Sequence, residues 1–395
     1  MKTRKTKTAA QISPDKTTTK SKSWTMRNGD SEQVLKDFPD DHFDSVVCDP
    51  PYGLSSDTMD GQHVARVIQS WMTNDNLETK GRGFAGAEWD AFVPPPSLWK
   101  EVFRVVKPGA YVAAFSSSRT DDLLKLSLRL AGFEITDTVA YILRGGFPKY
   151  VDLGRAVEKR LRQWGHTPPE AHNDTTAVRT DLSGQSFLQS LQRKKSHGQS
   201  EQTVIEPSHY ISKRWADYHS NLKNAFQPII LARKPAWSST TDNLIVYGVG
   251  ALNIGDCRIP RADNDDDAGG LDATKLGRYP ANVIGELGED NSKFFFNPHN
   301  AISKRPSSVD KDLYMPEGIK NDHPTPKPVE LMEWLVRLVT PPGGTILDPF
   351  TGSGSTGIAA LHQGFNFVGV EMGQYYYDIA VKRLTNCHGT LSEVS

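Results

Sequence analysis

The tetrapeptide Asp49-Pro50-Pro51-Tyr52 directly follows residues 44–48, a strand-like run that predicts a buried strand. The turn places an acceptor carboxylate, two prolines that stiffen the backbone and an aromatic ring on one short segment. These groups can hold one extruded nucleobase by its exocyclic amine, with the ring stacked on the base. The alternative interpretation is a rigid proline turn after a buried strand, without any chemistry.

A second candidate site lies near the C-terminus, where residues 346–357 predict a strand, a glycine turn and the start of a helix. Gly352 and Gly354 remove side chains where a ligand could lie against the backbone, and the helix N-terminus offers N–H groups. Glu371 ends the next predicted strand, where a carboxylate can accept both hydroxyls of a ribose. The ligand would then be a nucleoside. Gly352, Gly354 and Gly357 also fit the fingerprint of an NAD-binding site, and the turn could equally serve only to permit close packing; these alternatives stay open.

Helical and strand periodicity alternate in two parts of the chain. The first part predicts strands at 44–48, 110–115 and 134–143 and helices at 98–106 and 121–131. The second predicts helices at 329–339 and up to about 363 and strands at 345–348 and 366–371. This alternation is typical of an α/β fold with a doubly wound sheet. If both parts join in one sheet, both candidate turns lie at carboxyl ends of strands, where such sheets bind ligands.

Basic residues are concentrated in two regions of a chain whose net charge is only −1. Residues 1–22 carry seven Lys or Arg and one Asp, and we expect them to form a disordered tail. Residues 141–240 carry fifteen basic and eight acidic side chains. This distribution favours a face that binds a polyanion, although a solvated charged surface without a partner is the alternative.

The number and spacing of the cysteines and the hydropathy of the chain indicate where in the cell the protein is located. The three cysteines, Cys48, Cys257 and Cys387, are too far apart for a metal-ligand pair or a disulfide framework. We therefore expect no bound metal. No signal-peptide core and no apolar run of membrane-spanning length occurs, so the sequence predicts a soluble, cytoplasmic protein without a membrane partner.

The two turns together resemble the amino-methylating DNA methyltransferases that use S-adenosylmethionine, and the run at 323–328 strengthens the resemblance. The early proline turn and late glycine turn are similar to the β arrangement of that family. The resemblance implies a circularly permuted, Rossmann-like methyltransferase sheet with a large inserted target-recognition region. The implied divisions are a basic tail at 1–22, a catalytic half at 23–149, the target-recognition insert at 150–322 and a cofactor-binding half at 323–395. Weaker matches to bacterial and phage members lie at 86–90, 104–109, 145–149, 231–235 and 278–283.

The resemblance also assigns roles to individual residues. It implies that the catalytic turn consists of Asp49, Pro50, Pro51 and Tyr52. It implies that the cofactor is bound by Asp30 at its adenine, by Glu371 at its ribose, by the loop residues Asp348, Phe350, Gly352 and Gly354, and near its methionine end by His323, Thr325 and Lys327. The segment 294–299 departs from the family pattern, which puts the details of recognition in doubt but not the chemistry.

The predicted reaction is methyl transfer from S-adenosylmethionine to the exocyclic amine of a flipped base in double-stranded DNA. Family usage of Asp in the first position of the turn favours adenine N6 over cytosine N4, as in restriction-modification methylases of bacteria and phages. The alternatives are an N4-cytosine enzyme, methylation of RNA or of a protein glutamine, a catalytically idle DNA-binding relative and an NAD-dependent enzyme. The sequence leaves open whether the protein is a monomer or a homodimer.

Overall fold

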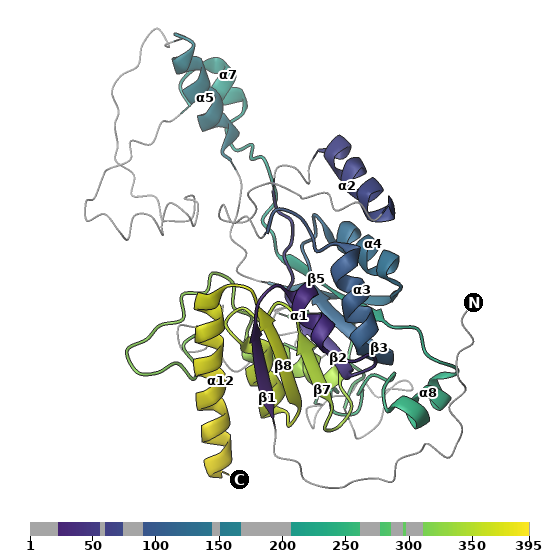
Figure 1. Ribbon diagram of the computed structural model, residues 1–395. Coiled ribbons are helices and arrows are strands. Elements are labelled where there is room, and N and C mark those ends of the chain that lie inside the picture. The colour runs from purple at the N-terminus through teal and green to yellow at the C-terminus, as the bar shows by residue number, and fades with distance from the viewer. Residues whose placement is uncertain are drawn as a thin grey trace. The chain divides into compact units, whose positions relative to one another are not determined.

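The computed structural model describes residues 23–55, 60–73, 90–143, 151–166, 207–260, 277–285, 295–297 and 311–394. Its centre is a sheet with the strand order β1-β8-β7-β2-β3-β5-β4-β6 (Figure 1). These strands are β1 (Trp24–Asn28), β2 (Phe43–Cys48), β3 (Val106–Phe115), β4 (Glu134–Ile142), β5 (Phe226–Arg233), β6 (Val283–Gly285), β7 (Thr345–Asp348) and β8 (Asn366–Glu371). The protein is therefore an α/β protein built on one sheet, as the sequence predicted. The antiparallel β5, which was not predicted, makes this sheet mixed.

Strands from the N-terminal part and from the C-terminal part of the chain pair in the middle of this sheet. Strand β2 pairs in parallel with β7, with Ser45 opposite Ile346 and Val46 opposite Leu347. Strand β1 pairs in parallel with β8 at the edge, where it also contacts helix α12 (Gln374–Val394) (Figure 1). Since parallel strands end at the same edge, the turns that follow β2, β7 and β8 lie side by side. The predicted joining of the two halves into one sheet is confirmed.

Helices cover both faces of the sheet. On one face, Val46 and Val112 belong to a buried cluster with residues of α3 (Pro96–Val105) and α4 (Asp121–Ala131). On the other face, the hydroxyl of Ser45 lies 2.8 Å from that of Thr340, which caps α10 (Val329–Val339). Helix α11 (Ser355–His362) packs between α10 and α12. Successive strand side chains point to opposite faces, so a strand covered on both sides is buried throughout, as β2 is. Its two polar side chains have partners, Lys107 for Asp44 and Thr340 for Ser45. The remaining helical segments of this part are α1 (Ser31–Val34), η2 (Leu35–Asp37), α2 (Gly61–Thr73) and α8 (Thr240–Tyr247).

Most predicted elements have the expected bounds, but β3 begins earlier than expected. The segment Lys107-Pro108-Gly109, which we expected to separate a helix from a strand, lies within β3. The Asn243 amide donates to the carbonyl of Pro108 (2.8 Å), and Gly109 has a φ of 84° against the same side chain. A tertiary contact from α8 thus holds Pro108 and Gly109 within the strand. The sequence alone predicted that the strand begins after them.

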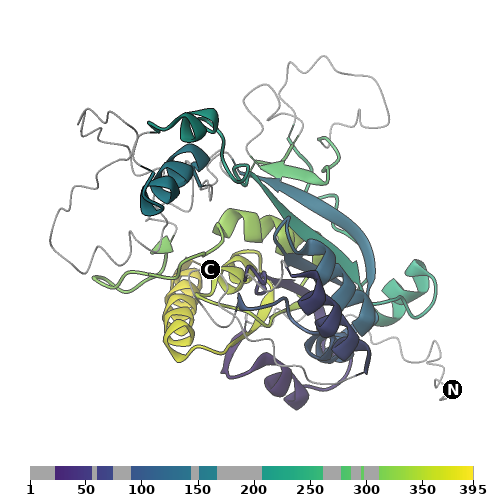
Figure 2. The same ribbon diagram turned by 90° about the horizontal axis from the view of Figure 1, so that it is seen from above.

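Strand β5 lies within residues 150–322, where the sequence predicted neither a helix nor a strand. It runs antiparallel to β3 and β4, and Ile229, Ile230 and Ala232 are completely buried. Figure 2 shows β4 and β5 as long strands side by side. Pro228 lies within this strand, and its carbonyl accepts the N–H of Ser116 (2.9 Å). The apolar run is short and contains a proline, so periodicity gave no signal for it.

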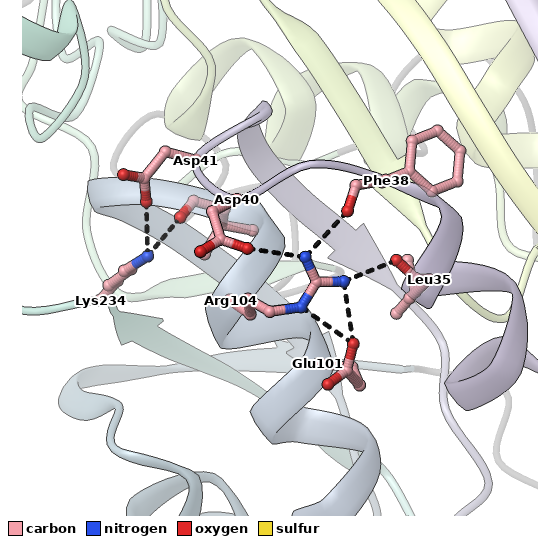
Figure 3. A network of polar contacts seen from close by, with 8 residues as sticks. Leu35, Phe38, Asp40, Asp41, Glu101, Arg104 and Lys234 are labelled. Atoms are coloured by element: carbon pink, nitrogen blue, oxygen red, sulfur yellow. Dashed lines mark hydrogen bonds and ion pairs between the residues drawn. The ribbon is translucent and has the colours of Figure 1, made fainter.

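A network of polar contacts stabilises the end of the sheet opposite the turns that follow β2, β7 and β8 (Figure 3). Arg104, near the end of α3, donates to the carbonyls of Leu35 and Phe38 and pairs with Asp40 (2.8 Å) and Glu101 (2.9 Å). Lys234, which follows β5, pairs with Asp41 (2.8 Å) and donates to the Val106 carbonyl (2.7 Å). Two of the weaker family matches, 104–109 and 231–235, therefore contribute structural contacts. Within the described residues, no helix combines the length and apolarity needed to cross a membrane.

The chain divides into two compact units, one formed by residues up to 142 and from 226 onward, and one by residues 143–225. In the second unit, α5 (Leu153–Gln163) packs against α7 (Tyr210–Arg214). The buried Glu158 carboxylate on α5 accepts hydrogen bonds from Ser208, the His209 N–H and Ser212. Burial alone raises the pKa of a carboxyl, but these donors bring the pKa of Glu158 below its usual range. The target-recognition role of 150–322 stays a prediction.

Candidate active site

The proline turn is fixed by a buried carboxylate from a distant part of the chain. Asp90, which is 2% exposed, accepts the backbone N–H of Tyr52 at 2.6 Å and of Gly53 at 2.9 Å through one oxygen. Its other oxygen lies 3.4 Å from the N–H of Leu54. Gly53 has a φ of 64° and packs against the backbone of residues 92 and 93, where a Cβ would lie 2.7 Å from the Val93 nitrogen. The turn is therefore held in one conformation by both Asp90 and this close approach.

The side chains of Asp49 and Tyr52 form a hydrogen-bonded group with two partners. The Tyr52 hydroxyl donates to Asp49 Oδ1 (2.6 Å) and accepts from the Gln227 amide on β5. Lys327 forms an ion pair with Asp49 Oδ2 and donates to the Tyr52 hydroxyl at 3.2 Å. Burial, with the nearby Asp49 charge, raises the pKa of Tyr52 well above its ordinary value. The phenol consequently stays protonated at neutral pH.

The glycine loop follows β7 and is organised by Asp348. This carboxylate is 1% exposed and accepts the Phe350 N–H (2.9 Å) and the Thr356 hydroxyl (2.6 Å). Burial raises the pKa of Asp348 to about 7, although both hydrogen bonds favour its charged form. Phe350 packs against the core beside Trp99, with ring centroids 6.1 Å apart. Asp348 therefore connects its own loop to the first turn of α11.

Gly352 and Gly354 both have positive φ values, 55° and 90°, and both lie close to neighbouring groups. A Cβ at Gly352 would lie 2.9 Å from His323 Nε2, and one at Gly354 would lie 3.3 Å from Ala380. Gly354 is the residue before α11, whose first N–H groups have no partner within the helix. The glycines thus permit both the loop conformation and the approach of the 321–327 segment.

Glu371 and Asp30 lie together beside this loop. Glu371 ends β8 opposite Asn28, and its oxygens accept the N–H groups of Gly352 and Gly373, each at 2.8 Å. Burial raises the pKa of Glu371. Asp30 caps α1 by accepting the Gln33 N–H (3.0 Å). Each carboxylate has about four acceptor positions, so both retain capacity for the hydroxyls or amine of a ligand.

The segment that contains His323, Thr325 and Lys327 is joined to the glycine loop by Asn321. The Asn321 amide donates to the Ser353 hydroxyl (3.0 Å), and its oxygen accepts the His323 N–H (3.0 Å). Burial lowers the pKa of His323 to about 4, so the imidazole is neutral at pH 7. Thr325 is exposed, whereas Lys327 turns toward the proline turn.

The structure brings nearly all predicted site residues to one edge of the sheet, at the ends of β1, β2, β7 and β8. Three further residues were not predicted for the site. Asp90 was only the last residue of a weak family match, while Gln227 and Asn321 are single amides whose importance depends on contacts with residues far away in the sequence. No local pattern distinguishes such residues from surface amides.

A family model described as DNA methylase, of the N6/N4 class, matches residues 43–382. The chain belongs to this family. The type II methyltransferase M.HindIII of Haemophilus influenzae is 30% identical over 176 residues, which cover 44% of this chain and 45% of that protein. The type II methyltransferase M2.DpnII of Streptococcus pneumoniae is 47% identical over 62 residues, which cover 16% of this chain and 23% of that protein. These matches therefore span less than half the length of the curated relatives.

Solved structures with a similar arrangement include a DNA methyltransferase, PvuII, described as cytosine-N4-specific. Its TM-score is 0.47 at 14% identity, with 94% of each chain covered. A complex of M1.HpyAVI with SAM has a TM-score of 0.42 at 16% identity, covering 91% of this chain and 98% of that one.

Proposed function

We propose that the protein transfers a methyl group from S-adenosylmethionine to the exocyclic amine of a flipped base in double-stranded DNA, most readily adenine N6. The observation that carries this proposal is the adjacency of the two turns. The Asp49 carboxylate and the glycine loop follow the paired strands β2 and β7, and Glu371 ends β8, the next strand. An amine acceptor and a nucleoside site of this kind suit a reaction between two nucleoside-like substrates.

The residues beside the glycine loop fit the methyl donor. Glu371 would accept the ribose hydroxyls, Asp30 would accept the adenine amine, and the first N–H groups of α11 face the same loop. The donor would supply an electrophilic sulfonium methyl group. The protein's own contribution is then to position the donor and the acceptor amine.

The proline turn can bind the amine and make it more nucleophilic. The lone pair of an exocyclic amine is delocalised into the ring, so the amine is a poor nucleophile. Asp49 and the Pro50 carbonyl can accept its two N–H groups and favour the pyramidal form that attacks the methyl group. Tyr52 would stack on the extruded base and offset part of the few kcal/mol that unstacking costs. No covalent enzyme intermediate is required, and the buried Cys48, whose pKa is raised well above its ordinary value by burial, has no role as a nucleophile.

The unit formed by residues 143–225 supports DNA as the substrate. Its described residues carry seven Lys or Arg and three Asp or Glu. Trp164, Tyr210 and Tyr218 are more than half exposed, and the Arg160 guanidinium lies over the Trp164 ring at 5.1 Å. Exposed aromatic rings among cationic side chains can contact both bases and phosphates. We therefore assign DNA contact to the α5–α7 unit.

The preference for adenine N6 rests on Asp49 as the first residue of the turn, since family usage pairs Asp there with adenine more often than with cytosine. Nucleoside analysis tests both the reaction and the base. The protein is incubated with labelled S-adenosylmethionine and DNA of mixed sequence, and the digested nucleosides are separated by mass spectrometry. N6-methyladenine is expected, and N4-methylcytosine as the only product would overturn the base assignment.

The variant Asp49→Ala separates an enzyme from an idle DNA-binding relative. We expect it to lose base methylation while calorimetry still detects binding of S-adenosylmethionine, because Asp49 lies on the amine side of the site. Methyl transfer that persists in this variant would refute the role of Asp49. Binding of NAD instead of S-adenosylmethionine by the unaltered protein would refute the cofactor.

A further inference from the structure

We propose that Lys327 is an internal competitor of the target base: its ammonium group occupies the amine-acceptor position of Asp49 and has to leave before a base can bind. This inference rests on the proposed function, because it concerns the same site. It assigns Lys327 to the base pocket rather than to the methionine end of the cofactor.

The first argument is the occupancy of Asp49. One carboxylate oxygen accepts the Tyr52 hydroxyl at 2.6 Å, and the other forms the ion pair with Lys327. The side chains of Asp49 and Lys327 are only 22% and 12% exposed. A base amine that enters this site must therefore exchange with a donor that is already bound there.

The second argument is the chemical match between an ammonium group and an extruded base. The Lys327 nitrogen lies 5.5 Å from the centre of the Tyr52 ring and 4.9 Å from that of the Phe115 ring. A base amine offers N–H donors to the carboxylate, and its ring offers a flat face to an aromatic side chain. Lys327 satisfies both features of the pocket, with hydrogen bonds to the carboxylate and cation–π contacts to the rings.

The third argument concerns which parts can move. Gln227 holds the Tyr52 hydroxyl, and Asp90 holds the Tyr52 backbone, so the turn itself is fixed. Asn321 holds the backbone before Lys327, and α10 begins at Val329 directly after Pro328. The long side chain of Lys327 is thus the component that can rotate out while its surroundings keep their positions.

Competition makes a prediction with an unusual direction: removal of Lys327 should strengthen base binding. A duplex carries 2-aminopurine next to the methylated base, which the nucleoside experiment and sequencing of the modified sites identify, so that the target base keeps its exocyclic amine. The fluorescence of the 2-aminopurine rises when the target base beside it leaves the stack. In the absence of cofactor, Lys327→Met should reach half-maximal fluorescence at a protein concentration about tenfold lower than the wild type, the size expected for loss of a competing charge-assisted hydrogen bond.

Three controls interpret the result. Lys327→Arg keeps a cationic donor, so it should bind no more tightly than the wild type. Lys382→Met removes an exposed lysine on α12 and should leave the fluorescence titration unchanged. If Lys327→Met is unfolded by circular dichroism, Lys327→Gln takes its place with the same expected direction.

Equal or weaker base extrusion by the folded Lys327→Met variant would overturn the proposal, because a purely structural or cofactor-binding lysine gives that result. Failure of the proposed function looks different: the wild type would then produce no methylated nucleoside at all. The two outcomes are therefore distinguishable in one set of proteins.

Discussion

The hydrogen bonds of Asp90 allow a quantitative test of how the proline turn is held. In Asp90→Ala the N–H groups of Tyr52 and Gly53, which now donate at 2.6 and 2.9 Å, lose a charged acceptor. A hydrogen bond to a charged group contributes about 1.5–3 kcal/mol, and the 3.4 Å contact with Leu54 adds little. Two such bonds at the low end of this range predict that the free energy of unfolding falls by about 3 kcal/mol.

Asp90→Asn should be milder. Its amide oxygen can still accept from Tyr52 and Gly53, but the charge is lost and the amide N–H₂ then faces the N–H of Leu54. We expect a loss of about 1–2 kcal/mol. Because the turn carries Asp49 and Tyr52, both variants should also methylate DNA more slowly, even at temperatures where they are fully folded.

Urea denaturation followed by circular dichroism measures the change in stability, and the rate of methyl transfer to DNA measures the change in function. Asp122→Asn, which alters an exposed carboxylate on α4, is the matched control and should behave like the wild type. If Asp90→Ala lies within about 0.5 kcal/mol of the wild type, the range of ordinary surface substitutions, the turn does not depend on this carboxylate and the reasoning fails.

Three other predictions concern the cofactor site, pH and DNA. Glu371→Ala should weaken binding of S-adenosylmethionine in calorimetry by about tenfold or more, since it removes the proposed ribose acceptor and a partner of the loop, and unchanged affinity would refute the assignment. Burial raises the pKa of Asp348 to about 7, so between pH 3.8 and 7 the folded state keeps a proton that the unfolded state loses. The stabilising contribution of this proton is therefore complete below pH 3.8 and is lost as the pH rises to about 7. The stability of the wild type relative to Asp348→Asn should therefore decline over that range, by up to about 4 kcal/mol in urea titrations at different pH values, and a constant difference would contradict the pKa. Neutralising Arg160 and Arg214 together should reduce the slope of log K against log salt for DNA binding by up to about 2, and an unchanged slope would remove the α5–α7 unit from the interface.

The sequence predicted the central strands well because each is a short apolar run between glycine, proline or polar residues. The predicted bounds of β7 and β8 are those observed. Local patterns carry no information on strand neighbours, however, and β5 was missed although it lies between β3 and β4. In the sequence, β5 is a short stretch that contains a proline and gives no strand signal. It becomes a buried strand because it pairs with two long strands, β3 and β4.

The same limit applies to the candidate site, where residue types were predicted but their partners were not. Asp348 and Glu371 look alike in the sequence, since each is a carboxylate at the end of a buried strand. In the structure, the Phe350 N–H and the Thr356 hydroxyl hold Asp348 against its own loop and the start of α11, whereas Glu371 accepts the N–H groups of Gly352 and Gly373 at 2.8 Å and is only partly buried. One acid is therefore suited to shape the loop and the other to bind a ligand. This division depends on which groups fold against each carboxylate, so the effects of Asp348→Asn on stability and of Glu371→Ala on affinity should be separable, although both residues end adjacent strands.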